Sequence, residues 1–353
     1  MKIWEKLDFS YSLSKLTSFN TSEVLGEKAS SCFAIIGLIA AARYAWTPAQ
    51  GFYKHFIRPR NDLKAKYGGG WAIVTGASDG IGEAMCYELA GRGFDIVLMA
   101  RSQEKLEKVA KKCEEEFKVQ TRIEVFDFST LSNMEGVDNL KNILEKLKEI
   151  DISLLVNNVG KAHANHIHEH SVEAIFQMIH VNICSQTFMS VFVVPLLLSR
   201  YEKTGKKSAI LNYSSSSVAD TDRMIAIYAA TKAYNMTFSK VMLKEYKDKI
   251  DVLTITPRNV KTQMNSGVYL FSIQPEEHAK AVVEAVGRDE QTWGHYLHGM
   301  QSWLFGIPAA ARWMNNYDQK KFQNFMEKKK AVALTQQAMV DVATADNEEK
   351  EQD

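Results

Sequence analysis

Short apolar runs alternate with helical segments between residues 57 and 292, and this alternation restricts the fold more than any other feature. A strand–helix–strand repeat is typical of βαβ units on a parallel sheet. Continuous apolar runs such as Ile-Val-Leu-Met at 96–99 fit strands that are covered on both faces. The pattern predicts an α/β fold, a doubly wound parallel sheet (Rossmann fold) of about seven strands with helices on both faces. The strands that can be delimited are 71–74, 95–100, 121–126, 152–157, 208–213 and 251–255.

The regions outside the alternation differ in composition. Residues 1–56 form an N-terminal region with a membrane-anchor segment at about 29–46, and residues 57–292 form the Rossmann-fold domain. Residues 293–330 make an aromatic and apolar extension, and residues 331–353 a polar tail that we expect to be disordered. Within the domain, helices are expected at 80–92, 104–117, 172–201 (bent at Pro195) and 225–247.

Charge and cysteine content exclude several classes of function. The formal net charge is +1, so there is no electrostatic case for binding nucleic acid. The four cysteines are far apart in the sequence and lack the spacing of a zinc site, so we expect reduced thiols and no metal: Cys32, Cys86, Cys113 and Cys184.

A glycine-rich segment, Thr75 to Gly82, follows the first predicted strand and opens a helix. Glycines at this spacing permit a tight turn, allow the backbone to approach a pyrophosphate, and pack the helix against the strand. The helix then offers its free N–H groups to phosphate. The segment therefore predicts a dinucleotide site, with these contacts: Gly76, Ser78, Asp79, Gly80, Ile81 and Gly82.

The end of the second strand indicates which dinucleotide binds. An acidic residue there would bond the adenosine ribose and repel a 2′-phosphate. This chain has Arg101 followed by Ser102 instead, and a guanidinium matches phosphate by its planar fork of donors. NADP(H) is the predicted cofactor, although a solvated Arg101 at a helix start is the alternative.

Tyr228 and Lys232 are four residues apart on a predicted helix, so both side chains lie on one face. A nearby cation is expected to lower the phenol pKa from about 10 toward the working pH. Lys232 can also hold the ribose hydroxyls of the nicotinamide. Ser215, at the end of the fifth strand, can reach the same crevice, although four consecutive serines at 214–217 leave its identity ambiguous by one position.

These motifs resemble the short-chain dehydrogenase/reductase superfamily over roughly residues 68–290. The resemblance implies a catalytic set of Asn182, Ser215, Tyr228 and Lys232, in which Asn182 anchors a water that links Lys232 to solvent. It also implies further cofactor contacts from Asp127 at the adenine, from Asn158 in Asn-Asn-Val-Gly at 157–160, and from Val260 and Thr262 at the nicotinamide amide.

Two departures from the family pattern are visible in the sequence. Val159 replaces the usual alanine, which is a mild change, and Arg258 stands where glycine is typical. The second change puts the backbone conformation at residue 258 in doubt.

The flanks resemble the membrane-bound branch with 17-beta-hydroxysteroid dehydrogenases and very-long-chain 3-oxoacyl-CoA reductases. Residues 32–42 are apolar without interruption and would be about 17 Å long as a helix. The longer segment 29–46 would reach about 27 Å, which is marginal for spanning the roughly 30 Å of hydrocarbon in a membrane. A helix packed on the protein's own core is the alternative. Tryptophans at 4, 46, 293, 303 and 313 favour membrane interfaces. The resemblance implies the endoplasmic-reticulum membrane, with the catalytic domain facing the cytosol.

The leading hypothesis is NADPH-dependent reduction of a carbonyl on a hydrophobic substrate, most of all a long-chain 3-oxoacyl-CoA in fatty-acid elongation. A 17-beta-hydroxysteroid or retinoid dehydrogenase is the runner-up, and a non-catalytic NADPH-binding scaffold is the alternative of another class. Homodimers through the 225–247 helix are usual in the family that the chain resembles. Four histidines between His163 and His170 could form a metal site or, as we favour, a polar loop at the mouth of the crevice.

Overall fold

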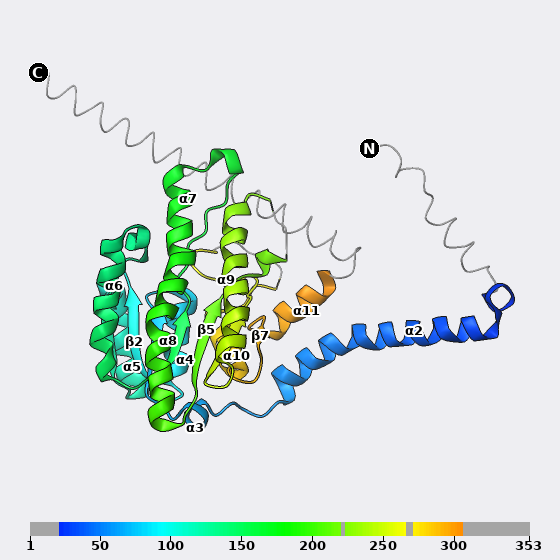
Figure 1. Ribbon diagram of the computed structural model, residues 1–353, viewed down its shortest axis with the longest axis horizontal. Helices are drawn as coiled ribbons and strands as arrows, with labels where there is room; N and C mark the ends of the chain where they lie inside the picture. Colours follow the sequence, from blue (N-terminus) through cyan, green and yellow to red (C-terminus); the bar gives the residue numbers. More distant parts are fainter. Residues whose placement is uncertain (1–20, 220–222, 266–270, 306–353) are drawn as a thin grey trace, which may run out of the picture. The chain divides into compact units, whose positions relative to one another are not determined.

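The computed structural model describes residues 21–219, 223–265 and 271–305, and the chain divides into two compact units, Met1–Phe56 and Ile57–Asp353 (Figure 1). The second unit contains the sheet and its helices. The first contains the helix α2 (Thr21–Phe52), which continues into a π-helical turn, η2 (Tyr53–Ile57).

The sheet has seven parallel strands in the order β3-β2-β1-β4-β5-β6-β7, which confirms the doubly wound fold. The strand order reverses between β1 and β4, and in such sheets ligands bind at the carboxyl ends of the strands beside this point. The strands are β1 (Trp71–Thr75), β2 (Asp95–Ala100), β3 (Thr121–Val125), β4 (Ile152–Asn157), β5 (Ser208–Tyr213), β6 (Ile250–Ile255) and β7 (Gln291–Thr292).

Helices cover both faces of the sheet because successive strand side chains point to opposite sides. In β1, Ala72 and Val74 belong to one core cluster and Ile73 to the other. The first cluster packs against α3 (Leu63–Tyr67), α4 (Gly80–Ala90), α5 (Gln103–Phe117) and α10 (Pro275–Ala285). The second packs against α6 (Met134–Lys146), α8 (Ser185–Thr204) and α9 (Ala226–Tyr246). The other described helices are η3 (Phe128–Ser132), η4 (Leu147–Glu149), η5 (Ile167–Glu169), α7 (Val172–Ile179), η6 (His180–Cys184), η7 (Ser216–Val218) and α11 (Tyr296–Phe305).

The single helix expected over 172–201 is interrupted. The α-helical pattern of α7 gives way to the π-helical turn η6, and α8 then continues through Pro195 to Thr204. The irregular turn therefore lies upstream of Pro195. A π-helical turn inserts one extra residue into a helix and is frequent at functional sites.

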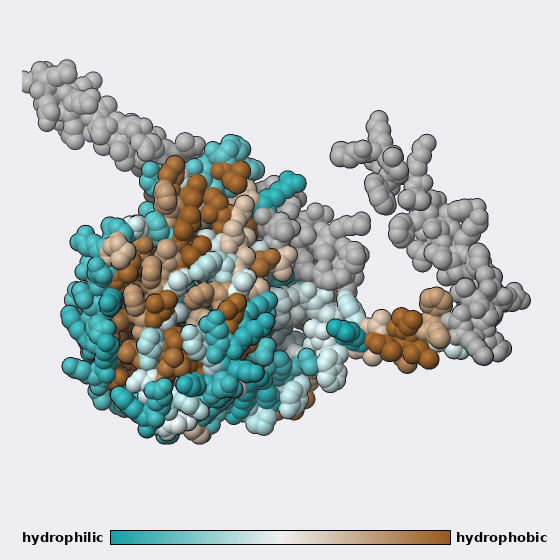
Figure 2. All heavy atoms as spheres, in the orientation of Figure 1, coloured by the Kyte–Doolittle hydropathy of each residue, from teal (hydrophilic) through white to brown (hydrophobic). Residues whose placement is uncertain are grey.

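The helix α2 presents large apolar side chains at its surface, which is brown along its middle in Figure 2. Phe33, Leu38 and Trp46 are 61%, 71% and 61% exposed. By length and composition Ser31–Ile57 is able to cross a membrane, and it is longer than the segment predicted at 29–46. The second segment that meets the same criterion, Val172–Thr204, is half buried and covers the sheet.

Candidate active site

The turn after β1 requires glycine for steric reasons. Gly76 and Gly80 have φ of +67° and +58°, a region that residues with a Cβ rarely adopt. A Cβ at Gly82 would overlap the carbonyl oxygen of Gly76 and lie 2.6 Å from Nδ2 of Asn158. The first turn of α4 therefore packs directly on the loop, and the backbone forms a cradle that side chains would fill.

Asn158, directly after the neighbouring strand β4, holds this loop. Its Nδ2 donates to the carbonyl oxygen of Thr75 at 3.0 Å, and its backbone N donates to Oγ1 of Thr75 at 3.0 Å. Oγ1 of Thr75 donates in turn to the carbonyl oxygen of Val156 at 3.1 Å. The amide of Asn158 thus positions the glycine loop, and its predicted direct contact with the cofactor stays a prediction.

The N-terminus of α4 is open to an anion. Asp79 occupies the N-cap position, yet its side chain makes no capping bond and pairs with Nζ of Lys105 at 2.9 Å. The first N–H groups of a helix lack partners within the helix, so an uncapped terminus can bind phosphate. The side chain of Ile81 packs against the core, and Ser78 is half buried beside the turn.

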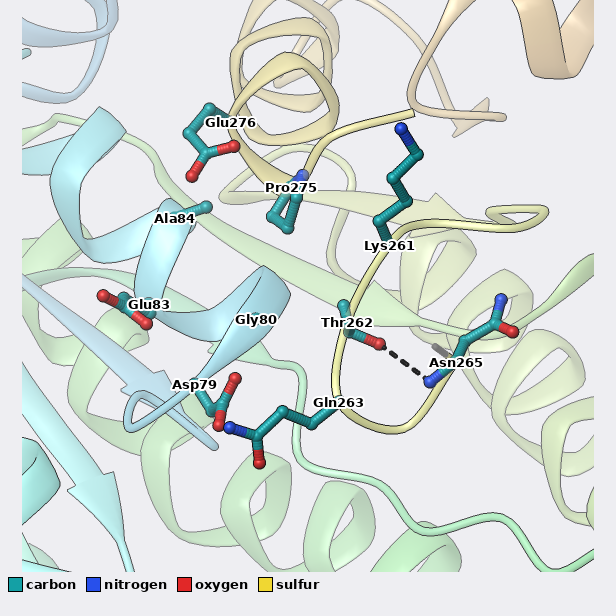
Figure 3. A pocket seen from close by; sticks show the side chains of 10 residues that line it. All are labelled: Asp79, Gly80, Glu83, Ala84, Lys261, Thr262, Gln263, Asn265, Pro275 and Glu276. Atoms are coloured by element: carbon teal, nitrogen blue, oxygen red, sulfur yellow. Dashed lines mark hydrogen bonds between the residues drawn. The ribbon is translucent and has the colours of Figure 1, made fainter. Parts of the chain in front are cut away.

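A cavity of about 510 Å³ adjoins this terminus (Figure 3). Asp79 and Gly80 line one side, Lys261 and Thr262 from the loop after β6 line another, and Pro275 at the start of α10 closes it. A Cβ at Gly80 would lie 2.9 Å from Cγ2 of Thr262, and Oγ1 of Thr262 accepts from the backbone N of Asn265 at 3.2 Å. The glycine cradle and the uncapped terminus fit a phosphate group, whereas the cavity beside them also carries the carboxylates of Asp79, Glu83 and Glu276, so we assign the phosphate to the cradle and not to the cavity.

Arg101 and Asp127 lie at the carboxyl ends of β2 and β3, which are neighbours in the sheet. Arg101 is exposed, and its guanidinium makes no hydrogen bond or ion pair with the residues that the structure describes. Asp127 is exposed as well, and it caps η3 by accepting from the backbone N of Ser129 at 2.9 Å. The predicted contact of Arg101 with the 2′-phosphate of the cofactor stays a prediction, and the exposure of its side chain is compatible with it.

The predicted catalytic side chains meet between β5 and α9. The side chain of Ser215 is close enough to the phenol of Tyr228 to lower its pKa, and its Oγ accepts from the backbone N of Ser217 at 3.2 Å. The neighbouring Ser214 is buried and donates to the carbonyl oxygen of Lys232 at 2.7 Å. Of these two serines, it is therefore Ser215 that faces the phenol. Nζ of Lys232 donates to the carbonyl oxygen of Tyr213 at 3.1 Å and lies 5.9 Å from the centroid of the Tyr228 ring.

Burial shifts both ionisable groups away from their charged forms. Burial raises the pKa of Tyr228, and the hydrogen bond with Ser215 lowers it by a smaller amount. The expected net lowering of the Tyr228 pKa is therefore wrong, because loss of hydration outweighs the neighbouring groups. Burial also lowers the pKa of Lys232 to about 8. At neutral pH the phenol holds its proton, which suits a proton donor.

Asn182 lies in the π-helical turn η6 and is fully buried. Its Oδ1 accepts from the backbone N of Lys161 at 2.7 Å, and its Nδ2 donates to the carbonyl oxygen of Lys161 and to Oγ1 of Thr231, both at 2.9 Å. A Cβ at Gly160 would lie 3.3 Å from Nζ of Lys232 and 3.4 Å from Oδ1 of Asn182. Gly160 therefore leaves room where Asn182 and Lys232 approach each other, although the water relay implied by the resemblance stays a prediction.

The segment after β6 is fixed by α11. Val260 is buried and forms a parallel bridge with Ile273. Arg258 adopts no positive φ, so the glycine typical at this position is not required, and its Nε donates to Oγ of Ser302 at 2.9 Å. His298 contacts the same segment, with Nε2 at 3.2 Å from the carbonyl oxygen of Asn259. The extension beginning at residue 293 thus supports the predicted nicotinamide segment, as far as its described residues extend.

A backbone hydrogen bond that no motif in the sequence indicates links two loops at the predicted mouth of the crevice. The backbone N of Asn165 donates to the carbonyl oxygen of Met224 at 2.8 Å, and Met224 has φ of +68°, which is rare for a long side chain. His166 and His168 stack with ring centroids 5.9 Å apart. Among the described residues, no group of three or more His, Cys, Asp or Glu side chains is arranged to hold a metal.

Comparison with known proteins places this geometry in a family. Residues 70–270 match the family model described as short chain dehydrogenase. The chain belongs to the short-chain dehydrogenase family. It is 35% identical over 303 residues to very-long-chain 3-oxoacyl-CoA reductase-A of Danio rerio, covering 83% of this chain and 92% of the relative. It is also 35% identical over 284 residues to inactive hydroxysteroid dehydrogenase-like protein 1 of Homo sapiens, covering 76% of this chain and 83% of the relative.

Among solved structures, the short-chain dehydrogenase fold recurs in L-sorbose reductase from Gluconobacter frateurii, complexed with NADPH and L-sorbose. The TM-score is 0.55 and the identity 25%, over 65% of this chain and 97% of that one. The chain is thus a family oxidoreductase that acts on CH–OH and ketone groups with a nicotinamide dinucleotide, in the branch of 3-oxoacyl-CoA reductases and hydroxysteroid dehydrogenases.

Proposed function

We propose that the protein reduces a long-chain 3-oxoacyl-CoA to the 3-hydroxy product with NADPH. The observation that carries this proposal is the meeting of Ser215, Tyr228 and Lys232 with a phenol that is protonated at neutral pH. The exposed Arg101 supports NADPH over NADH. The names of relatives such as the Danio rerio reductase support the substrate class.

The residues divide the work of reduction as follows. The nicotinamide, when bound, supplies the hydride. Tyr228 donates its proton to the carbonyl oxygen, and Ser215 donates a hydrogen bond that stabilises the charge developing there. Lys232 is the adjacent cation, held by the Tyr213 carbonyl, and it favours the phenolate that Tyr228 becomes.

The test is oxidation of NADPH by purified protein with 3-oxoacyl-CoA substrates of increasing chain length, with a 17-ketosteroid and retinal in parallel. We expect turnover on the acyl-CoA series that rises with chain length. Turnover on the steroid alone would establish the runner-up instead. In Tyr228→Phe only the transferable proton is removed, so turnover should drop by roughly two to four orders of magnitude while NADPH still binds. A Phe variant with normal turnover would show that Tyr228 is not the acid.

The same assay decides the non-catalytic alternative. The human relative named as inactive shows that this class must be tested. Against it, the full set of Asn182, Ser215, Tyr228 and Lys232 is present in this chain. Tight NADPH binding without turnover on any of these substrates would favour a scaffold.

The proposal extends to location and assembly. The exposed apolar surface of α2 supports an anchor in the endoplasmic-reticulum membrane, with the catalytic domain in the cytosol. Trp293 and Trp303 are partly buried, so they offer less apolar surface than Trp46. Exposed Val191 on α8 and Val241 on α9 support a homodimer through these helices.

A further inference from the structure

Two amide side chains are buried between α8 and α9, among both apolar groups and small hydroxyl side chains such as Ser185 and Ser239. Gln186 on α8 and Asn235 on α9 are each 2% exposed. Nε2 of Gln186 donates to the carbonyl oxygen of Asn235 and to Oγ of Ser239, both at 3.4 Å. Oε1 of Gln186 and Oδ1 of Asn235 are buried and accept no hydrogen bond from the described part of the chain. The two amides are therefore only partly satisfied.

Such an arrangement lowers stability. A buried polar group without a partner costs about 1–3 kcal/mol, whereas replacing both partners with apolar groups of similar shape can be neutral. Met189 and Met242, from the same two helices, pack in the adjacent core without this cost. Packing between the helices therefore does not explain why amides occupy these positions.

The Tyr213 carbonyl connects the pair to the active site. Nδ2 of Asn235 donates to this oxygen at 3.4 Å, and Nζ of Lys232 donates to the same oxygen at 3.1 Å. A carbonyl oxygen has two lone pairs, so the Asn235 amide and the Lys232 ammonium together use both of them. Because Asn235 occupies one acceptor direction, Lys232 is restricted to the other.

We propose that Asn235, held in place by Gln186, is a positioning residue that fixes the ammonium of Lys232 through their shared Tyr213 carbonyl. The proposal rests on the proposed reductase function. Asn235 does not touch the reacting atoms; it acts through Lys232. The titratable side chain beside Lys232 is Tyr228, whereas Tyr213 contacts it through its backbone carbonyl, and burial is the cause of the lowered pKa of Lys232, without a contribution from a carboxylate of the described residues.

The first test is the double variant Gln186→Leu/Asn235→Leu, which removes both buried amides together. We expect a melting temperature close to that of the unmodified protein, because no orphan amide remains, and a kcat that falls at least tenfold. The matched control is Thr187→Val, which removes another hydrogen bond between α8 and α9, the one of 3.0 Å between Oγ1 of Thr187 and the Tyr234 hydroxyl, without touching the two amides or the Tyr213 carbonyl, and it should keep the full kcat. A stable double variant with unchanged kcat would overturn the proposal.

The second test does not need turnover. Asn235→Asp preserves the shape of the side chain and places a carboxylate on the network of Lys232, so the pKa of Lys232 should rise by one unit or more. Titration of protein labelled with [ε-13C]lysine, with the Lys232 resonance identified from Lys232→Arg, measures this directly by NMR. An unchanged Lys232 pKa would contradict the proposed coupling. If the unmodified protein shows no turnover, the reductase function fails while this titration still decides whether Asn235 acts on Lys232.

Discussion

Replacing Arg101 with alanine should remove most of the preference for NADPH over NADH. Arg101 is exposed and without a partner among the described residues, so its guanidinium is available to the 2′-phosphate. A unit charge about 4 Å from a phosphate of charge about −2 gains roughly 2 kcal/mol in water-like surroundings. A charged hydrogen bond contributes about 1.5–3 kcal/mol by mutational measures. Arg101→Ala should therefore weaken NADPH binding by roughly 30-fold, at about 1.4 kcal/mol per factor of ten, and leave NADH binding unchanged.

Calorimetric titration of both cofactors at about 50 and 200 mM salt checks this expectation. Because Arg101 is exposed, its contribution should shrink at the higher salt, where screening is stronger. Arg101→Lys keeps the charge without the planar fork of donors, so its affinity for NADPH should lie between that of the unmodified protein and that of Arg101→Ala. Lys108→Ala, on the exposed face of α5 where Lys108 pairs with Glu104 at 2.7 Å, is the control and should alter neither affinity. The assignment of Arg101 to the 2′-phosphate is refuted if Arg101→Ala keeps the full NADPH preference.

Three further outcomes follow from the geometry. Reductive kcat/KM, measured from pH 6 to 10, should be constant below about pH 8 and fall above it, because Lys232 loses its proton near pH 8. A kcat/KM that stays constant up to pH 10 would contradict this role of Lys232. Gly82→Ala should abolish NADPH binding in a titration, since its methyl group would overlap the Gly76 carbonyl, whereas Gly37→Ala, with open space around it, should bind normally. A chain starting at Ile57 should leave the membrane pellet at least in part and still bind NADPH, while the full chain should stay in the pellet after carbonate washing. Finding the full chain wholly in the soluble fraction would refute the proposal that α2 is a membrane anchor.

The strands could be predicted closely because a strand that is buried on both faces appears in the sequence as a continuous apolar run. The ranges 95–100, 152–157 and 208–213 agree with β2, β4 and β5, which are almost entirely buried. The helices α6 and α10 were not delimited, although both carry start signals. Asn133 caps α6 through the backbone N of Gly136, and Pro275 with Glu277 begins α10 in a capping box. These signals are short and local, and their meaning depends on the apolar periodicity that follows.

The candidate site was predicted as a set of residues, but their hydrogen-bond partners were not. The role of Asn158 in holding the glycine loop depends on the register of β4 beside β1. The pair of Gln186 and Asn235 exists only because α8 and α9 pack together across 49 positions of sequence. Neither amide belongs to a motif, so each would pass as an ordinary polar residue on a helix.

The raised pKa of Tyr228 affects the pH at which each direction of the proposed chemistry should run. A phenol whose pKa is raised by burial donates a proton in reduction, but it is seldom ionised to accept one in oxidation. In the proposed reduction Tyr228 becomes a phenolate, so it must regain a proton before the next turnover. The reverse oxidation needs the phenolate as its base, so pH profiles of the two directions should show that oxidation requires a more alkaline medium than reduction does.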